Sequence, residues 1–461
     1  MTLIRLSLEF NTLVRSQMKY SGFCLYTKEK VMKTLTSYEY ALKTLSNHAF
    51  KGSDKETLEV QVALGKKLIP MLPILSTMEG VKEFSTKHVL EASNIRGVMS
   101  LSKDILNHEF GWVPLDTASS QSLITSAITR DNECLNKIFH LEENLPSDIY
   151  TTIGEEIRQT FNLGDIPRKV IKKALMAWGY GGSAGLCSLT QTKPEQLNAV
   201  MADIAKDLGF KGIYAMRQAC LDAWDEDALE HSWELPDGYE IHQVITQDTF
   251  AKDMLTGQYV YPAKRVEITL NGKQRGIDCR WAKVGKRSKK ESGTRSIGAN
   301  LIHSLDAYLM RELVRRCKQD FIIKPEEFKE VIKYSDIQVK DPKAEELFHM
   351  WEETNIVSLN ILNHLSYGDC LPRPYWEAIC QVIDELPKEG FDIRPIHDEF
   401  ACLPRYANSM RYQFNHLIAE LYLSTILQYF SKQFRLLDIK PIDEAKPEMV
   451  RQILEADYLL S

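Results

Sequence analysis

Residues 168–182 read Arg-Lys-Val-Ile-Lys-Lys-Ala-Leu-Met-Ala-Trp-Gly-Tyr-Gly-Gly. Arg168, Lys172, Met176 and Tyr180 recur at steps of four residues. Such steps drift only about 40° around an α-helix, so the four side chains form one stripe roughly 18 Å long. A stripe of this length matches a nucleotide, because two cations suit a triphosphate, the methionine offers an apolar surface to a base, and the tyrosine can reach the sugar beside the glycines. An amphipathic core helix with its basic residues in solvent fits the same pattern.

The composition is that of a globular protein. The 461 residues are 44% hydrophobic and 26% charged, enough for two or three domains. The net charge of −6 means that any contact with nucleic acid needs a local concentration of Lys and Arg. The nine cysteines are scattered, which predicts neither a zinc site nor disulfides and favours a reducing cytoplasm. We expect neither a signal peptide nor a membrane span, because polar residues interrupt the apolar stretches.

Periodicity along the chain predicts a mostly helical α+β protein. Residues 1–106 and 311–390 have helical patterns, and Gly111–Asp116 predicts a short strand that ends on a carboxylate. Trp233–Trp281 predicts β-structure with glycine turns, and Ile393–Leu403 predicts a strand, a turn and a second strand.

Other chemically interesting residues are ambiguous when each is taken alone. Asp116 follows its strand, and Asp398 lies in the turn Ile396–Phe400, where a carboxylate can point at a metal from a rigid base. His303 and Asp306 are three residues apart at a possible helix start. Each also has a plain structural interpretation as a solvated turn, a helix cap or a core histidine.

Together these elements resemble the single-subunit RNA polymerases of phages and mitochondria. Asp116 with its serine-rich sequel, the Arg-xxx-Lys-xxx-Met-xxx-Tyr-Gly helix, the His-Ser-x-Asp segment and the His-Asp turn occur in the order of that family's palm and fingers motifs. The ending Ile453–Tyr458 also resembles the family, and the resemblance covers roughly residues 90–461. It implies a right-hand polymerase fold with an antiparallel palm sheet and helical fingers.

The resemblance also implies a division of the chain. The expected parts are an N-terminal helical region that is a candidate partner-binding region (1–89), the first palm segment (90–145), the fingers (146–303) with a basic DNA-reading hairpin at about 233–295, the second palm segment (304–317 and 391–461) and a helical insertion (318–390).

The implied mechanism uses two Mg²⁺ ions, which Asp116, Asp398 and the backbone of Thr117 would hold. Lys172 would bind the triphosphate and protonate the pyrophosphate leaving group. Tyr180 and His303 would contact the 2′-hydroxyl of the incoming nucleotide and so distinguish ribose from deoxyribose. The expected catalytic residues are therefore Asp116, Lys172, Tyr180, His303 and Asp398. The expected substrate-binding residues are Arg168, Lys172, Lys173, Met176, Tyr180, Gly181, His303 and His397.

The stretch Lys264–Arg295 contains eleven Lys and Arg against three acids. It resembles the family's DNA-reading hairpin, for which backbone phosphates would supply most of the affinity. A solvated loop is the alternative. The expected DNA-binding residues are Lys264, Arg265, Lys283, Lys286 and Arg287.

The pattern departs from the family in two motifs. Thr117 stands where many relatives have glycine, and His397-Asp398-Glu399 is the pattern of family A DNA polymerases. Against DNA synthesis, those enzymes usually have phenylalanine in place of Met176, a glutamate gate in place of Ser120–Leu123, and nothing like the His-Ser-x-Asp segment. A family A-like DNA polymerase fragment and a non-catalytic, polymerase-like DNA-binding scaffold are the alternatives.

The layout is closest to the larger chain of the two-chain RNA polymerases of certain podoviruses, because only 115 residues precede Asp116. A smaller protein subunit would then supply the missing N-terminal part, and an accessory protein could recruit the enzyme. The other expected partners are a DNA template, the RNA product and ribonucleoside triphosphates, in the cytoplasm of a bacterial host if the chain is phage-encoded.

Overall fold

The computed structural model describes residues 32–88, 92–164, 166–247, 251–252, 259–260, 263–270, 272–280, 283–286, 296–434 and 437–461. Helices dominate these residues and the strands form small sheets, so the expected α+β class is confirmed. The described sheets are antiparallel except for one two-stranded pair. Among the described helices, none is long and apolar enough to cross a membrane.

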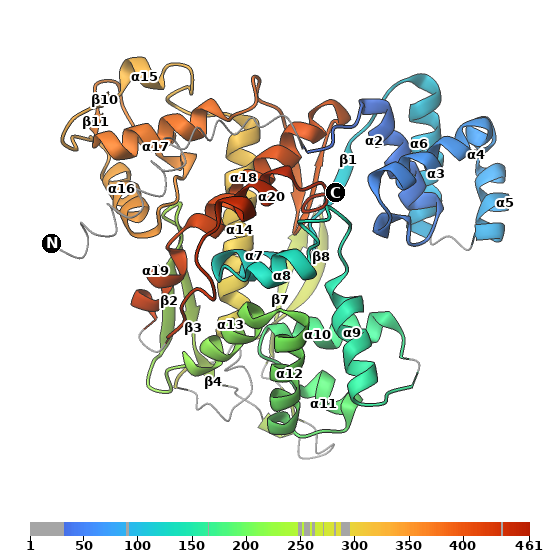
Figure 1. The fold of residues 1–461 in the computed structure, drawn as a ribbon, viewed down its shortest axis with the longest axis horizontal. Helices are drawn as coiled ribbons and strands as arrows, with labels where there is room; N and C mark the ends of the chain where they lie inside the picture. Colours follow the sequence, from blue (N-terminus) through green and yellow to red (C-terminus); the bar gives the residue numbers. More distant parts are fainter. Residues whose placement is uncertain are drawn as a thin grey trace.

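The N-terminal part of the described chain is a helical unit with its own core, at the upper right of Figure 1. A capping box starts its first helix, because Thr36 accepts the N–H of Glu39 and Glu39 accepts the N–H of Thr36. Val98 and Ile105 of its last helix belong to this core, so residues 92–107, expected in the palm, pack with the helices before them. The elements are α2 (Ser37–Ala49), η1 (Ser53–Lys55), α3 (Leu58–Leu68), η2 (Ile69–Met71), α4 (Leu72–Leu75), α5 (Met78–His88) and α6 (Ala92–Asn107).

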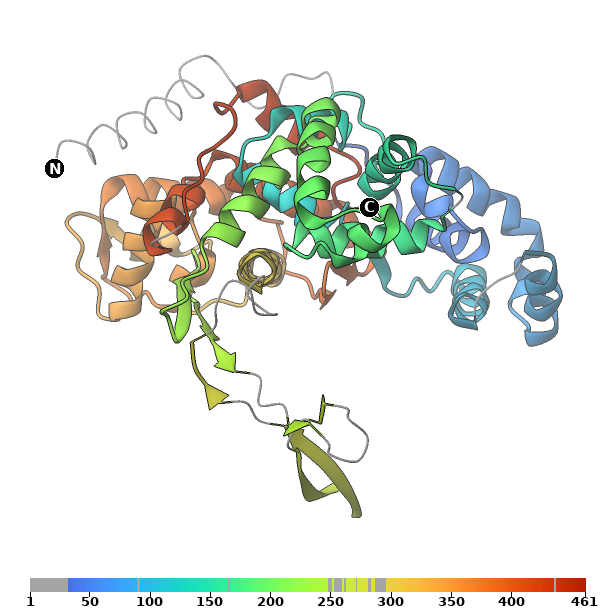
Figure 2. The ribbon, with the colours of Figure 1, turned by 90° about the horizontal axis from the view of Figure 1, so that it is seen from below.

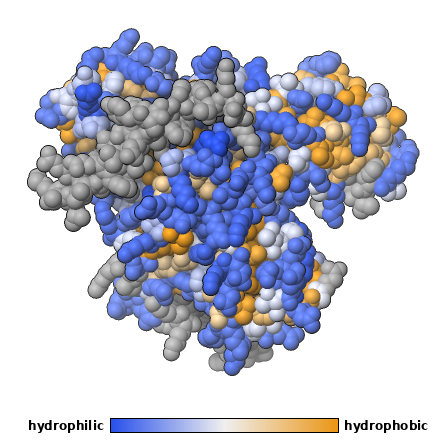
Figure 3. All heavy atoms as spheres, viewed as in Figure 1, coloured by the Kyte–Doolittle hydropathy of each residue, from blue (hydrophilic) through white to orange (hydrophobic). Residues whose placement is uncertain are grey.

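The surface of this unit differs from that of the middle of the molecule. The face seen in Figure 3 is largely hydrophilic over the central elements, and hydrophobic residues gather over the N-terminal helices. Ile74 of α4 and Met78, the first residue of α5, are 56% and 45% exposed.

The central sheet joins two segments that are far apart in the sequence. β1 (Val113–Asp116) pairs antiparallel with β13 (Glu399–Cys402), which pairs antiparallel with β12 (Arg394–Ile396). The first and third residues of β1 are buried and its last, Asp116, is exposed, as strand alternation requires. The strand and the strand-turn-strand expected from the sequence are confirmed, and they form one sheet.

Helices pack against this sheet and form the main core (Figure 1). Phe400 of β13, for example, lies against Phe414 with ring centroids 6.1 Å apart. The elements are α7 (Ser120–Ile128), α8 (Asn132–Lys137), α14 (Ser296–Lys318), η4 (Pro404–Tyr406), α18 (Ala407–Leu423), α19 (Ile426–Gln433) and α20 (Pro447–Glu455).

A second group of helices lies below the sheet in Figure 1. Asp148 caps the first of them by accepting the N–H of Thr151, and Pro167 immediately precedes the second. The helices are α9 (Ile149–Thr160), α10 (Arg168–Gly179), α11 (Ala184–Thr190), α12 (Pro194–Leu208) and α13 (Lys211–Asp222).

An arm of paired strands projects from the body of the molecule (Figure 2). Gly238 and Gly272 have φ values of 70° and 72°, which explains why glycines stand in its turns. The pairs are β2 (Glu230–Glu234) with β3 (Glu240–Val244), β4 (Thr246–Gln247) with β9 (Lys283–Val284), β5 (Ala251–Lys252) with β6 (Tyr259–Val260), and β7 (Ala263–Leu270) with β8 (Lys273–Arg280).

Residues 318–390, expected as a helical insertion, contain a second hydrophobic core of their own, at the upper left of Figure 1. This core includes Phe328, Trp351 and Ile379. Two short strands pair in parallel beside the helices. The elements are α15 (Phe328–Val331), β10 (Lys333–Tyr334), α16 (Pro342–Thr354), η3 (Leu359–Asn363), β11 (Cys370–Leu371) and α17 (Arg373–Asp384).

A buried ionic network on α14 ties these parts together. Glu312 accepts the backbone N–H of Leu359 in the insertion at 2.7 Å, and Arg311 binds Asp237 in the β2–β3 turn at 2.6 Å. Arg316 is almost completely buried and donates to both carboxylate oxygens of Glu420 on α18 at 2.8 Å. Burial of such charges is tolerated only when they are paired, so α14 fixes its neighbours through these contacts.

Replacing Arg316 by leucine should lower the free energy of unfolding by about 3–5 kcal/mol, because half-buried Glu420 would lose its cation and buried Glu312 would keep only Arg315. Lys318→Leu, at the exposed end of the same helix, should change it by less than about 0.5 kcal/mol. Urea unfolding of both variants measures these changes in the free energy of unfolding. An Arg316→Leu variant that is as stable as Lys318→Leu would show that the buried network does not stabilise the protein.

Candidate active site

A cleft of about 610 Å³ opens where the central sheet, the N-terminal unit, α10 and α14 meet. The expected catalytic, substrate-binding and metal-binding residues line it, except for Lys173 and Gly181. Those that line it are Asp116, Thr117, Arg168, Lys172, Met176, Tyr180, His303, His397 and Asp398.

The central sheet positions both carboxylates, Asp116 at the end of β1 and Asp398 in the turn that leads into the neighbouring strand β13. Asp116 ends β1 opposite Glu399, and His397 and Asp398 form the two-residue turn between β12 and β13. The backbone N–H of Thr117 donates to the carbonyl of Asp398 at 3.1 Å. The positions of both aspartates are therefore set by backbone hydrogen bonds rather than by flexible loops.

The loop after β1 and the β12–β13 turn each contain a non-glycine residue whose backbone is in the left-handed conformation. His397 has a φ of 59° and Ser119 has a φ of 53°. A side chain with a Cβ adopts this conformation at a cost, typically of order 1–3 kcal/mol, and such strain clusters at functional sites.

The two carboxylates repel each other. Burial and the charge of Asp398 raise the pKa of Asp116 to about 6, although its side chain remains accessible from the cleft. Lys55 and, less strongly, Lys172 act in the opposite direction. Burial and Asp398 likewise raise the pKa of Asp306 to about 7. The cleft thus concentrates negative potential that a cation would relieve.

The donor set fits magnesium only with help from a substrate. The described residues contain no group of three or more His, Cys, Asp and Glu side chains that could hold a metal ion. Mg²⁺, however, is commonly bound through one or two carboxylates together with waters and substrate phosphates. Asp116 and Asp398 form such a pair.

One face of α10 supports the cleft and the other lines it. Ile171, Leu175 and Trp178 are buried against the core, whereas the stripe of Arg168, Lys172, Met176 and Tyr180 faces the cleft. This arrangement reconciles the two interpretations of the sequence, because the helix is amphipathic and its polar stripe also faces a cavity.

The first cation of the stripe is held in place by α9. Arg168 donates from Nε and Nη2 to Oδ2 of Asp148, at 2.9 and 2.5 Å. Although burial opposes the shift, hydrogen bonds from Thr151 and Arg168 lower the pKa of Asp148. Lys172 Nζ lies 5.1 Å from the centroid of the Tyr150 ring.

Lys173 is exposed and lies outside the cleft. It is one position, or about 100° of helix rotation, away from Lys172.

At the other end of the stripe, Tyr180 meets His303. The Tyr180 hydroxyl lies 3.0 Å from Nε2 of His303, and the rings meet edge to face with centroids 4.8 Å apart. Burial lowers the pKa of His303 and raises that of Tyr180 to about 12, so both groups are neutral at pH 7. A neutral phenol and a neutral imidazole together present both a donor and an acceptor.

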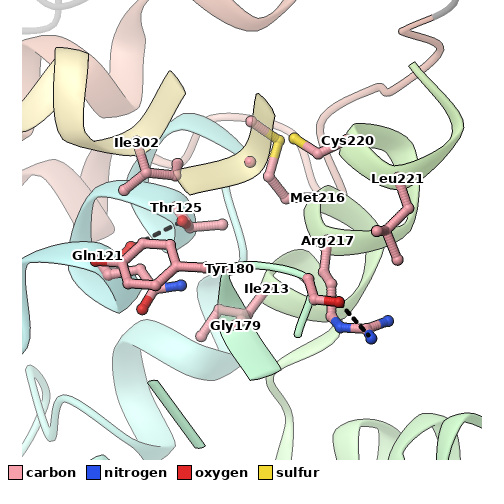
Figure 4. Close-up of a pocket in the computed structure, with 12 residues that line it drawn as sticks. Gln121, Thr125, Gly179, Tyr180, Ile213, Met216, Arg217, Cys220, Leu221 and Ile302 are labelled. Atoms are coloured by element: carbon pink, nitrogen blue, oxygen red, sulfur yellow. Dashed lines mark hydrogen bonds between the residues drawn. The ribbon is translucent and has the colours of Figure 1, made fainter. Parts of the chain in front are cut away.

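A small pocket behind Tyr180 shows how this end of α10 is fixed (Figure 4). Arg217 of α13 is buried and donates to the carbonyls of Trp178 at 2.9 Å and Gly181 at 3.5 Å. A cation at a helix C-terminus interacts favourably with the helix dipole. Gly181 has a φ of 96°, which favours glycine, and a Cβ added to Gly179 would lie 2.4 Å from the amide nitrogen of Gln121, so that this side chain would have to move.

Four of the five expected DNA-binding residues, Lys264, Arg265, Lys283 and Lys286, lie on the projecting arm, outside the cleft lining. Lys286 forms an ion pair with Asp227 at 3.1 Å, and Arg265 lies on β7 opposite Asp278. Lys264 and Lys283 are on strands, but their side chains, like the whole of Arg287, lie outside the described residues.

Several cleft residues were missed from the sequence, and three of them bear on the chemistry of the cleft. Asp148 and Tyr150 come from the start of α9, and Lys55 comes from η1 in the N-terminal unit. The Asp148 cap was a readable local signal, because an acid just before a helical pattern is a typical N-cap. Lys55 has no local signal, since only tertiary packing brings its loop to the cleft.

Comparison with models of known protein families and with curated proteins finds no match to this chain. The inference about its activity therefore rests on the residues of the cleft.

Asp116→Asn should stabilise the protein at neutral pH in the absence of divalent metal. Folding raises the pKa of Asp116 to about 6, so the folded state holds an extra proton between the ordinary aspartate pKa and pH 6, and stability falls as the pH rises through that window. The asparagine side chain of the variant has no carboxyl proton to release, so the variant does not lose this stability as the pH rises. Its Tm should exceed that of the wild type by roughly 1–3 °C at pH 7.5, and the difference should shrink toward pH 4.5.

Exposed Asp336 provides the control, because Asp336→Asn should leave Tm unchanged at both pH values. A Tm for Asp116→Asn below that of the wild type at pH 7.5 would show that the carboxylate pair is not repulsive.

Proposed function

We propose that this chain is the catalytic subunit of a phage-type, DNA-directed RNA polymerase with a right-hand arrangement of palm and fingers. One observation carries the proposal: a carboxylate pair, a stripe of two cations and a Tyr–His pair share one cleft. These are the groups that nucleotidyl transfer needs for metal, triphosphate and sugar, and their spacing along α10 fits one nucleotide.

In the proposed reaction, α10 binds and orients the ribonucleoside triphosphate. Arg168 and Lys172 contact the phosphates, Met176 lies against the base, and the sugar lies at Tyr180. Phosphoryl transfer depends mainly on holding the attacking and leaving oxygens in line and on neutralising charge. Asp148 supports this by holding the Arg168 guanidinium in one orientation before the substrate arrives.

Two Mg²⁺ ions held by Asp116, Asp398 and the substrate phosphates would activate the 3′-hydroxyl and neutralise the developing charge. Thr117 lines the same cleft, and its backbone carbonyl, which accepts the N–H of Ser119 at 2.8 Å, is the proposed further ligand. Lys172 is the group placed to give a proton to the departing pyrophosphate.

The Tyr180–His303 pair is the proposed sensor of the 2′-hydroxyl. Both groups are neutral and hydrogen-bonded to each other, so a ribose hydroxyl can join the pair as donor and acceptor. A deoxyribose would leave one of them unpaired, which disfavours it.

The projecting arm is proposed to contact the DNA template. The basic stretch Lys264–Arg295 supplies the positive charge that phosphate contacts require, and the net charge elsewhere is negative. A smaller protein subunit is proposed to complete the enzyme, and the separately packed segment 318–390 is a candidate surface for an accessory protein.

DNA synthesis is the second candidate, favoured by one feature. Glu399 follows Asp398 and pairs across the sheet with Asp116, so a third acid adjoins the metal-binding pair, as in family A DNA polymerases. Nucleotide choice separates the two candidates.

The first test is extension of an RNA primer on a DNA template, with ribo- or deoxyribonucleotides, with and without the smaller subunit. The proposal predicts templated addition of ribonucleotides that depends on Mg²⁺, and a loss of at least about 1,000-fold in Asp398→Asn. Preferential use of deoxyribonucleotides would refute RNA synthesis, and full activity of Asp398→Asn would refute the metal assignment.

Tyr180→Phe should lower the ratio of kcat/KM for ribonucleotides to that for deoxyribonucleotides by about tenfold, the value of one hydrogen bond. Tyr214→Phe is the matched control, because its hydroxyl contacts the Asn198 carbonyl at 3.4 Å outside the cleft. An unchanged ratio in Tyr180→Phe would remove this residue from sugar selection.

A further inference from the structure

Lys55 reaches the cleft from the N-terminal helical unit, whereas Arg168 and Lys172 reach it from α10. The two sources are separate parts of the molecule in Figure 1. The cleft is therefore lined on a second side by a cation, Lys55, that does not belong to the α10 stripe of Arg168, Lys172, Met176 and Tyr180.

The loop that carries Lys55 is held rigidly. Ser53 is buried, and its hydroxyl contacts the Ser46 carbonyl at 3.0 Å and Asn47 Oδ1 at 2.9 Å. Gly52 permits the sharp turn with a φ of 85°, and the N–H of Lys55 donates to its carbonyl at 3.0 Å. The backbone of Lys55 is thus fixed to the end of α2.

Helix α2 is in turn fixed to the helices that cover the sheet. Tyr40 donates to Asn408 at 2.8 Å, and buried Arg411 donates to Tyr40 at 3.1 Å. The position of Lys55 relative to the carboxylates is therefore part of the fold.

The side chain of Lys55 remains available to a ligand. It is 51% exposed and contacts only its neighbour Asp54 among the ion pairs of the described residues, at 3.0 Å. An exposed pair of this kind contributes little, so exchange for a phosphate costs little.

In-line phosphoryl transfer places the attacking hydroxyl opposite the leaving pyrophosphate. If α10 holds the triphosphate, the strand that carries the attacking hydroxyl approaches Asp116 from another side. We propose, on the basis of the proposed function, that Lys55 binds the phosphodiester that joins the last two nucleotides of the growing strand. The N-terminal unit then positions the nucleophile, and α10 positions the electrophile.

The test compares the wild type with Lys55→Gln and Lys51→Gln. Lys51 is exposed in the same loop but does not line the cleft, so its loss controls for a change in loop charge. Each protein is titrated with a DNA template carrying an RNA primer whose last linkage is either a phosphodiester or a neutral methylphosphonate. The Kd is measured by fluorescence anisotropy at several salt concentrations.

The wild type and Lys51→Gln should each lose about fivefold in affinity when the last linkage is made neutral, and Lys55→Gln should lose nothing further. The slope of log Kd against log salt should fall by about one in Lys55→Gln. In extension assays, Lys55→Gln should leave the KM for the ribonucleotide within about twofold.

Equal methylphosphonate effects in all three proteins would overturn the inference, as would a rise in nucleotide KM without a change in primer affinity. Binding is measured without catalysis. A wild type that binds the primer but fails to extend it even with the smaller subunit would therefore refute the proposed function, and the linkage comparison would still decide the role of Lys55.

Discussion

The repulsion between Asp116 and Asp398 is the constraint on which the rest of the cleft depends. Pairing of β1 with β13 and the tight β12–β13 turn force the two carboxylates together, and burial raises the pKa of Asp116 to about 6. Nothing in folding favours such a pair, because like charges that are partly removed from water destabilise the native state. Cations from separate elements surround it, and a bound divalent metal would complete the compensation.

Contacts around this carboxylate pair hold the neighbouring helices and side chains in fixed positions. Arg217 and the glycines fix the C-terminal end of α10, Asp148 fixes the guanidinium at its N-terminal end, and the ionic network of α14 fixes the helix that carries His303. These contacts decide where the side chains of the cleft point. In the proposed reaction, a site that is preorganised in this way would stabilise the transition state without having to rearrange.

Local patterns predicted the parts of the site, because each depends on neighbouring residues. Strand alternation placed Asp116, turn preference placed Asp398, and four-residue spacing placed the stripe that ends at Tyr180. Packing between distant segments was not predictable: no pattern links Lys55 to the cleft, and α6 joined the N-terminal core although the resemblance placed it in the palm. Lys173 could have been excluded from helix geometry alone, since it points about 100° away from Lys172.

The most direct measurement is a structure determined with a primer–template, Mg²⁺ and a non-hydrolysable ribonucleoside triphosphate. We expect two metal ions about 4 Å apart between Asp116 and Asp398, with the triphosphate on Arg168 and Lys172 and the 2′-hydroxyl within hydrogen-bonding distance of the Tyr180–His303 pair. A nucleotide bound elsewhere, or one whose sugar points away from that pair with no metal at the carboxylates, would contradict the assignment of this cleft to RNA synthesis.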